Sequence, residues 1–231
     1  VHDFGRYPGP HMTIERMWAL RNAILGATDT GATGVVVTHG TDTVEETVYL
    51  LDRSLPPTVP VVVTGAMRNV SELSWDGPPN RVAAPRGAAP PGARGRGAMV
   101  VMDERIIQGA EVVKTHTEEF GTFQSPNWGP LGIVDKGEVL FYRDSRRKPT
   151  LSPREPRFPV DLIKVVAGAD SRLIEAANNF TDEEVQVLKF VHQGFVLARP
   201  DLALHQRGQA SLLTTLVEAL YAWLLDPDEQ A

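Results

Sequence analysis

Two runs of three consecutive valines, residues 35–37 and 61–63, constrain the fold more than any other feature of the sequence. A short continuous apolar run is typical of a strand that is buried on both faces of a sheet. Between the two runs, apolar positions recur at helical spacing over residues 44–51. Strand, helix and strand at these lengths form a βαβ pattern, which predicts a parallel sheet.

Local signals add elements on both sides of this unit. Residues 13–25 carry a rough apolar stripe, with Thr13 placed to cap a helix and Gly26 placed to end it. Residues 98–102 form a third apolar run, which predicts a third strand.

The helix over residues 44–51 has its own start signal. Thr43 and Glu46 have the spacing of a capping box, in which Thr43 is the N-cap and Glu46 lies three residues later. We therefore expect the Thr43 hydroxyl to bond to the first turn of this helix.

The segment over residues 85–97 is rich in proline and glycine. It lies between two predicted strands, where a crossover helix would ordinarily be expected. Because a proline in a helix interior costs about 3 kcal/mol, the composition favours a long loop over a full-length helix. Such a loop is unusual in a compact domain.

Residues 131–134 and 138–142 flank Asp135-Lys136-Gly137, which is a signal for a β-hairpin. A charged, proline-rich stretch follows the hairpin. Beyond it, residues 160–166 resemble a strand, and residues 212–225 have helical spacing of their large apolar side chains.

We therefore predict an α/β fold with two domains. A parallel-sheet, Rossmann-like domain with a β-hairpin covers residues 1–143 and a linker covers residues 144–158. A smaller α/β domain covers residues 159–231.

Composition excludes several classes of function. The 231 residues include no cysteine, which rules out disulfides, thiolate zinc sites and a cysteine nucleophile. The formal net charge of −6 argues against general nucleic-acid binding, which needs a basic surface. The most apolar tract, residues 212–225, is too short to span a bilayer, and the first residues carry no secretory signal. We expect a soluble, cytoplasmic protein with no nucleic-acid or membrane partner.

A cluster of polar residues, THGTDT, follows the first valine run at residues 38–43. Ligand-binding loops of parallel sheets lie at the carboxyl ends of strands, and a helix N-terminus favours negative charge. Thr41 could then lose its proton or orient a water, and Asp42 could accept hydrogen bonds from a substrate ammonium. The alternative is that these residues only cap the helix, and the spacing alone does not decide between the two.

A hydroxyl nucleophile needs a base. The six histidines show no HExxH spacing, so a catalytic metal site has no support, and no GxSxG motif occurs. Lys114, in the sequence VVKTHT, follows two valines and precedes two threonines. Burial at a strand end would favour the neutral, basic form of this lysine, although an exposed lysine is the ordinary interpretation of such a residue.

Several segments together resemble the bacterial-type L-asparaginases, the asparaginase/glutaminase family. THGTDTVEET, at residues 38–47, resembles a signature of that family. Further similar segments follow in order: TGAMR (64–68), DGPPN (76–80), VVKTHT (112–117), FQSPNWGPLG (123–132) and VDLIKVVAGAD (160–170). The resemblance covers residues 8–177.

The resemblance implies hydrolysis of L-asparagine to L-aspartate and ammonia, with no cofactor and no metal; L-glutamine is a second candidate substrate. The matched motifs imply catalytic roles for Thr41, Asp42 and Lys114, and substrate-binding roles for Thr41 and Asp42. Thr41 would position a water or attack the amide carbon, Lys114 would be its base, and Asp42 would hold the α-amino group. Gly9 and Ala66 would also lie at the substrate. A homo-oligomer, either a dimer or a tetramer, is implied as well.

The sequence departs from the family in two respects. The family's other catalytic threonine lies in a TGGT turn after its first strand, together with a mobile loop that carries a catalytic tyrosine. No TGGT precedes residue 38 here. Gly9, in PGPHMT, occupies the place of a substrate-binding serine, so that only its N–H is left to reach a carboxylate. We therefore expect weak hydrolysis or none from these residues.

Two alternatives stay open. The chain could be a non-catalytic amino-acid-binding or assembly remnant with a pocket around Thr41 and Asp42. It could also be an asparaginase-like subunit of a tRNA-dependent amidotransferase, although the extra domain that such subunits usually carry is not visible in the sequence.

Overall fold

The computed structural model describes residues 1–145, 150 and 154–156 of the chain. The chain divides into two units, Val1–Pro156 and Arg157–Ala231, and the description below concerns the first. The predicted C-terminal domain over residues 159–231, with its strand and helix, lies outside the described residues, as does most of the predicted linker.

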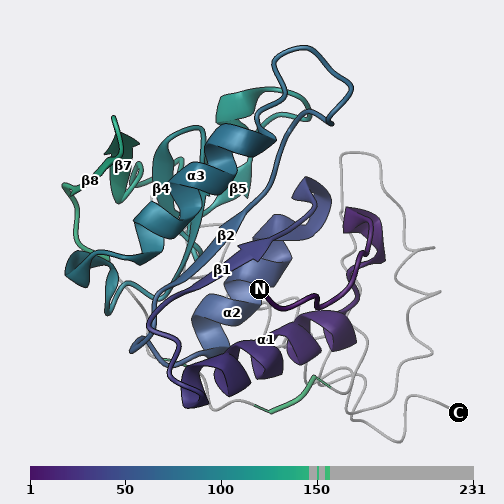
Figure 1. Ribbon diagram of the computed structural model, residues 1–231, viewed down its shortest axis with the longest axis vertical. Coiled ribbons are helices and arrows are strands. Elements are labelled where there is room, and N and C mark those ends of the chain that lie inside the picture. The colour runs from purple at the N-terminus through teal and green to yellow at the C-terminus, as the bar shows by residue number, and fades with distance from the viewer. Residues whose placement is uncertain (146–149, 151–153, 157–231) are drawn as a thin grey trace, which may run out of the picture. The chain divides into compact units, whose positions relative to one another are not determined.

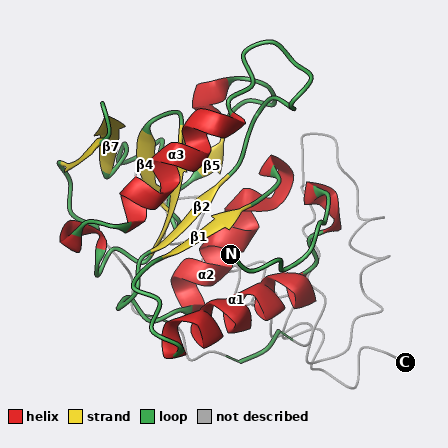
Figure 2. Ribbon diagram, viewed as in Figure 1, coloured by secondary structure: helices red, strands yellow, loops and turns green. Residues whose placement is uncertain are grey.

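A mixed six-stranded sheet forms the centre of the first unit (Figure 2). Its first three strands are parallel, with Val35 opposite Val61 and Val61 opposite Ala98, and the remaining three are antiparallel. The strands, in spatial order, are β1 (Val35–Thr38), β2 (Val61–Thr64), β3 (Ala98–Met102), β4 (Arg105–Gln108), β7 (Gly132–Asp135) and β8 (Glu138–Phe141). A separate two-stranded sheet pairs β5 (Val113–Lys114) with β6 (Phe123–Gln124).

Helices cover both faces of the large sheet (Figure 1). Side chains of α1 (Ile14–Asp29) and α2 (Val44–Ser54) form one core cluster with Val61 and Val63. Side chains of α3 (Gly77–Ala88) form a second cluster with Val62 on the opposite face. The alternation along β2 follows from the two-residue period of a strand. A bilayer crossing needs more length and apolar character than any helix in the described part of the chain has.

Four short 3₁₀ turns complete the described fold. They are η1 (Gly9–His11), η2 (Thr41–Thr43), η3 (Pro91–Ala93) and η4 (Phe120–Thr122). His39, Gly40 and η2 connect β1 to α2, so the polar cluster at residues 38–43 forms the short turn that its position between strand and helix predicts.

The predicted βαβ unit and β-hairpin are confirmed. β1, α2 and β2 follow one another with the two strands parallel. The hairpin joins β7 to β8 through Lys136 and Gly137, whose φ angles are +46° and +90°. Two positive φ values in a two-residue turn match the right-handed twist of the strands, which explains the glycine at this place.

The predicted end of the first helix at Gly26 is wrong. Thr13 caps α1 as predicted, with its side chain accepting a hydrogen bond from Arg16 N. The helix nevertheless continues through Gly26 to Asp29, and Gly31, with φ +98°, follows its end. A glycine inside a helix costs only about 1 kcal/mol, so the packing of the remaining turns outweighs it.

The predicted long loop over residues 85–97 is wrong in its first part. α3 begins at Gly77, before the proline-rich segment, and ends at Ala88. Two prolines lie in its first turn, where no N–H is required, and Pro85 lies in its last turn. Only Pro85 therefore costs the helix a backbone hydrogen bond, the one that an N–H at this position would donate four residues back.

The prediction that the first valine run is buried on both faces is also wrong. β1 has alternating intermediate and exposed residues, and Val36 is 37% exposed. Among the described residues β1 pairs only with β2 and lies at the edge of the sheet. All of β2 and β3, which lie between neighbours, is buried.

Candidate active site

Thr41 and Asp42 lie at the carboxyl end of the parallel strands. β1 ends at Thr38, and the backbone N–H of His39 still donates to Thr64 O of β2 at 2.8 Å. The chain then turns through η2 into α2. This places the hydroxyl and the carboxylate just beyond the edge where β1 and β2 end, which is the usual position of binding loops in parallel sheets.

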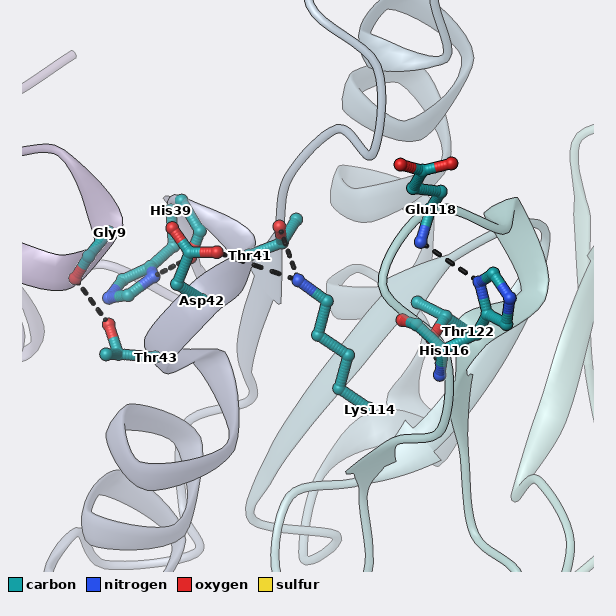
Figure 3. Close-up of polar contacts among 10 residues, drawn as sticks. Gly9, His39, Thr41, Asp42, Thr43, Lys114, His116, Glu118 and Thr122 are labelled. Carbon is teal, nitrogen blue, oxygen red and sulfur yellow. Dashed lines mark hydrogen bonds and ion pairs between the residues drawn. The ribbon is translucent and has the colours of Figure 1, made fainter.

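Lys114 reaches this turn from a different sheet. Its Nζ lies 3.1 Å from Thr41 Oγ1 and 3.7 Å from Asp42 Oδ1 (Figure 3). The lysine side chain is only 16% exposed, whereas the Asp42 side chain is 55% exposed. The structure therefore brings the three residues together as expected. A shielded amine beside a hydroxyl is suited to proton transfer, and the Asp42 carboxylate, although it faces Lys114 with Oδ1, is exposed enough to meet a second cation.

Gly9 lies against Asp42 on the other side of the turn. A Cβ added to Gly9 would be 2.6 Å from Asp42 Oδ2, and one added to Gly40 would be 3.0 Å from Gly9 Cα. The two backbones therefore meet at a distance that only glycine allows at both positions. Gly9 is itself buried, so the structure places it beside the carboxylate that the resemblance assigns to the substrate's amino group.

The predicted capping box is wrong. Thr43 makes no capping hydrogen bond with α2, and its Oγ1 donates to Gly9 O at 2.9 Å. The physical reason is tertiary: the segment before α1 offers a carbonyl that the local sequence does not reveal. The surplus hydroxyls of the turn are thus divided, with Thr43 anchoring Gly9 and Thr41 contacting Lys114 (Figure 3).

His39 was not among the predicted site residues, yet it fixes the geometry of the turn. Its Nδ1 lies 2.6 Å from Gly40 O and its Nε2 lies 3.0 Å from Thr47 Oγ1. Because a carbonyl can only accept, Nδ1 carries the proton and Nε2 accepts from the hydroxyl. Burial lowers the pKa of His39, with the Gly40 carbonyl and the charge of Glu46 opposing that change. The imidazole is therefore held in its neutral form.

Glu45 was also missed. Its Oε1 accepts a hydrogen bond from the backbone N–H of Lys114 at 2.9 Å. In the sequence this residue is one of two adjacent glutamates in the first turn of a helix, where acidic residues are common. No local signal separates it from Glu46, because its partner is distant in the chain.

Ala66 lies in the loop that follows β2, beside the turn. A Cβ added to the preceding Gly65 would be 2.5 Å from His39 O and 3.5 Å from Thr41 Cγ2. Asp76 accepts from the backbone N–H groups of Met67 and Arg68, both at 2.9 Å, and so holds the loop in place. The structure thus brings this segment next to Thr41.

Two other features of the described residues bear on the chemistry. No group of three or more histidine, aspartate or glutamate side chains in this part of the chain is arranged to hold a metal ion. A cavity of about 680 Å³ lies against α3 and is lined by residues that include Trp75, Arg86 and Lys136. Thr41, Asp42 and Lys114 are not part of that lining, so this cavity is separate from the cluster that they form.

Comparison of the sequence with known proteins identifies the family that the chain resembles. Residues 1–147 match the family described as Asparaginase, N-terminal. The chain is 44% identical to L-asparaginase 2 of Escherichia coli K12 over 117 residues, covering 51% of this chain and 34% of that protein. It is 34% identical to the L-asparaginase of Bacillus licheniformis over 223 residues, covering 94% of this chain and 69% of that protein.

The fold is similar to a solved structure as well. The crystal structure of a probable cytoplasmic L-asparaginase from Campylobacter jejuni matches with a TM-score of 0.70 at 29% identity, over 82% of this chain and 68% of that one. The chain spans from about a third to about two thirds of the length of these relatives. On the family match over residues 1–147 and the identity along most of its length, the chain belongs to the asparaginase family.

Proposed function

We propose that the chain carries an amidohydrolase site that converts L-asparagine to L-aspartate and ammonia. The observation that supports this most directly is the contact between Lys114 Nζ and Thr41 Oγ1 at 3.1 Å, with Asp42 Oδ1 at 3.7 Å from the same amine. A hydroxyl, an amine and a carboxylate supply a nucleophile or water-holder, a base and an ammonium ligand.

The proposed reaction begins with proton transfer. In its neutral form Lys114 takes the proton of Thr41, or of a water that Thr41 holds, and the oxygen attacks the side-chain amide carbon. The C–N bond then breaks and the proton returns to the leaving nitrogen, which departs as ammonia. If Thr41 itself attacks, a water next hydrolyses the ester to release L-aspartate.

Binding of the amino acid uses the remaining residues. Asp42 holds the α-ammonium, since its carboxylate is exposed and faces the turn. The N–H of Gly9 is a candidate ligand for the α-carboxylate, and the loop at Ala66 is a candidate for the side-chain end. The position of Gly9 against Asp42 supports its role, because the two charged groups of an α-amino acid are close together.

The test compares Thr41→Val and Lys114→Met with the unmodified chain in a sensitive assay for ammonia release from L-asparagine, with L-glutamine in parallel. We expect each substitution to lower kcat/KM by about 100-fold or more, as for loss of an acid–base partner. The double variant should be little worse than either single one, since the two residues act as a unit. Thr58→Val, at an exposed threonine, is the matched control.

The outcome also separates the alternatives. A slow rate in the unmodified chain agrees with the expectation drawn from the absent TGGT turn, which stays a prediction. Thermal stabilisation by L-aspartate without any ammonia release would favour an amino-acid-binding protein instead. If L-aspartate gives no thermal stabilisation and L-asparagine gives no ammonia, the proposal is contradicted.

The proposal extends to assembly and location. We propose a homo-oligomer in the cytoplasm that works on a small-molecule substrate without a cofactor. The Campylobacter jejuni neighbour is described as cytoplasmic, which supports the location. Light scattering should give two or four times the chain mass of 25.3 kDa; the mass of a single chain would contradict the oligomer.

A further inference from the structure

We propose that Glu45 is a positioning residue that holds Lys114 against Thr41. The inference rests on the proposed function, since it explains how Lys114, the proposed base, is placed. The starting observation is the 2.9 Å hydrogen bond from the backbone N–H of Lys114 to Glu45 Oε1, between residues that are 69 positions apart.

The Lys114 N–H has no partner within the β5–β6 pairing, which leaves it to the Glu45 carboxylate. In the β5–β6 hairpin, Thr115 N donates across to Thr122 O at 2.8 Å. Because successive residues of a strand direct their N–H groups to opposite edges, the N–H of Lys114 lies on the edge away from β6. A carboxylate of α2 therefore takes the place that a neighbouring strand would have in a wider sheet.

Glu45 is well placed to do this because of its helix position. It lies in the first turn of α2, where the exposed N–H groups favour a negative charge. The helix has no side-chain capping hydrogen bond at this end. The Glu45 carboxylate accepts a hydrogen bond from β5 instead of capping α2. A hydrogen bond to an ionised acceptor is about twice as strong as a neutral one.

The consequence is that one short segment holds Lys114 at both ends. Glu45 binds its backbone, while Thr41 and Asp42 face its Nζ at 3.1 and 3.7 Å. Fixing the peptide fixes the direction of the Cα–Cβ bond, and so the course of the side chain toward the turn. The Lys114 side chain therefore starts in the direction of Thr41, and the contacts of its Nζ with Thr41 and Asp42 select among its rotamers.

We expect the fold to survive the loss of Glu45, because apolar packing also joins β5 to α2. Val112, two residues before Lys114, is buried in the same apolar cluster as Val44 and Val48 of α2. This packing keeps β5 near α2 when the carboxylate is removed. The loss expected in a variant is therefore one of orientation and not of folding.

The experiment compares Glu45→Ala and Glu45→Gln with Glu46→Ala, which removes an exposed carboxylate from the same helix turn. The first readout is hydrogen exchange of the Lys114 amide, by mass spectrometry or NMR. The second is labelling of the Lys114 amine by trinitrobenzenesulfonate, mapped by mass spectrometry. The third is kcat and KM for ammonia release from L-asparagine.

We expect Glu45→Ala to speed both exchange and labelling at Lys114 by about tenfold or more, while Glu46→Ala leaves them unchanged. It should lower kcat by up to about 100-fold, as for a misplaced catalytic group, with little change in KM. Glu45→Gln keeps an acceptor oxygen at the same reach and should restore most of each loss.

Several results would overturn the proposal. These are unchanged exchange and labelling in Glu45→Ala, an unchanged kcat despite faster labelling, and a Glu45→Gln defect as large as that of Glu45→Ala. Failure of the proposed function is distinguishable, because the unmodified chain would then release no ammonia while exchange and labelling still report whether Glu45 holds Lys114.

Discussion

At the scale of single residues, the site depends on two glycines as much as on its charged groups. Gly9 and Gly40 let two segments touch, and the contact sets where the Asp42 carboxylate stands. The sequence comparison singled out Gly9 only because a hydroxyl is missing there. The structure gives it a second role, since any side chain at residue 9 would occupy the space of Asp42.

We predict that Gly9→Ala weakens binding of L-aspartate or L-asparagine by about tenfold or more and lowers the free energy of unfolding by about 1–3 kcal/mol, the cost of forcing a methyl group into filled space. The added Cβ would be 2.6 Å from Asp42 Oδ2 and 3.1 Å from Asp42 Cβ, so both the carboxylate and the backbone that carries it must shift. Isothermal titration with L-aspartate and thermal unfolding measure the two effects.

Gly26→Ala is the matched control for this prediction. A Cβ at Gly26 meets nothing within 4 Å, and alanine is the better helix former by about 1 kcal/mol. This variant should be slightly more stable and bind normally. Normal binding by Gly9→Ala would show that Asp42 does not need its present position.

At the scale of elements, the join between β1 and α2 is held by a neutral histidine. His39 bonds the turn through Gly40 O and the helix through Thr47. Local sequence predicted the strand and the helix, and it predicted the turn as a place for function. It did not predict the contacts of His39, because the Thr47 hydroxyl comes within hydrogen-bond distance of the imidazole only after α2 has formed.

We predict that acidification destabilises this join. The pKa of His39 is lowered from its ordinary value of 6.5 by burial. Between the lowered pKa and 6.5 the unfolded chain binds a proton that the folded chain does not, so stability falls as pH falls through that window. For one proton the slope is at most about 1.4 kcal/mol per pH unit. Above pH 6.5 the imidazole of His39 is neutral in both the folded and the unfolded chain, so this loss of stability is absent.

Thermal or urea unfolding from pH 7.5 to 5 measures the effect. His39→Gln keeps a donor and an acceptor but does not titrate, so its stability should depend less on pH than that of the unmodified chain. His11→Gln, at an exposed histidine, should leave the slope as it is. Equal slopes for all three proteins would rule out His39 as the source.

At the scale of the whole unit, two apolar clusters on opposite faces of one sheet hold the site elements in place. Leu51 of α2 is fully buried in the cluster that includes Val61 and Val63. The helix that begins beside Thr41 and Asp42 is therefore anchored by its far half. Stability and site geometry are linked through this packing.

We predict that Leu51→Ala lowers the free energy of unfolding by about 2–5 kcal/mol, the range for a buried leucine truncated to alanine. Leu140→Ala removes the same atoms from a side chain that is 58% exposed, and its cost should stay below about 1 kcal/mol. Urea unfolding followed by circular dichroism compares them. Similar losses would mean that Leu51 is not a core residue.

The sequence alone determined the helix α1, the unit of β1, α2 and β2, the strand β3, the hairpin and the family, because these depend on periodicity, turn residues and contiguous motifs. It brought Thr41 and Asp42 together for the same reason, since they are neighbours in the chain. It failed on the helix α3 and on the capping role of Thr43, where composition and spacing competed with packing that local sequence does not report.

Only the tertiary structure decided which distant groups meet. Lys114 reaches Thr41 across 73 positions, Glu45 reaches Lys114 across 69, and Thr43 reaches Gly9 across 34. Each of these contacts arises because strands and helices pack around one sheet, which brings loops from far apart to the same edge. Hydrogen bonds act over about 3 Å, so the partners of Glu45 and Thr43 became known only from the backbone positions, whereas the family resemblance had already grouped Lys114 with Thr41 and Asp42.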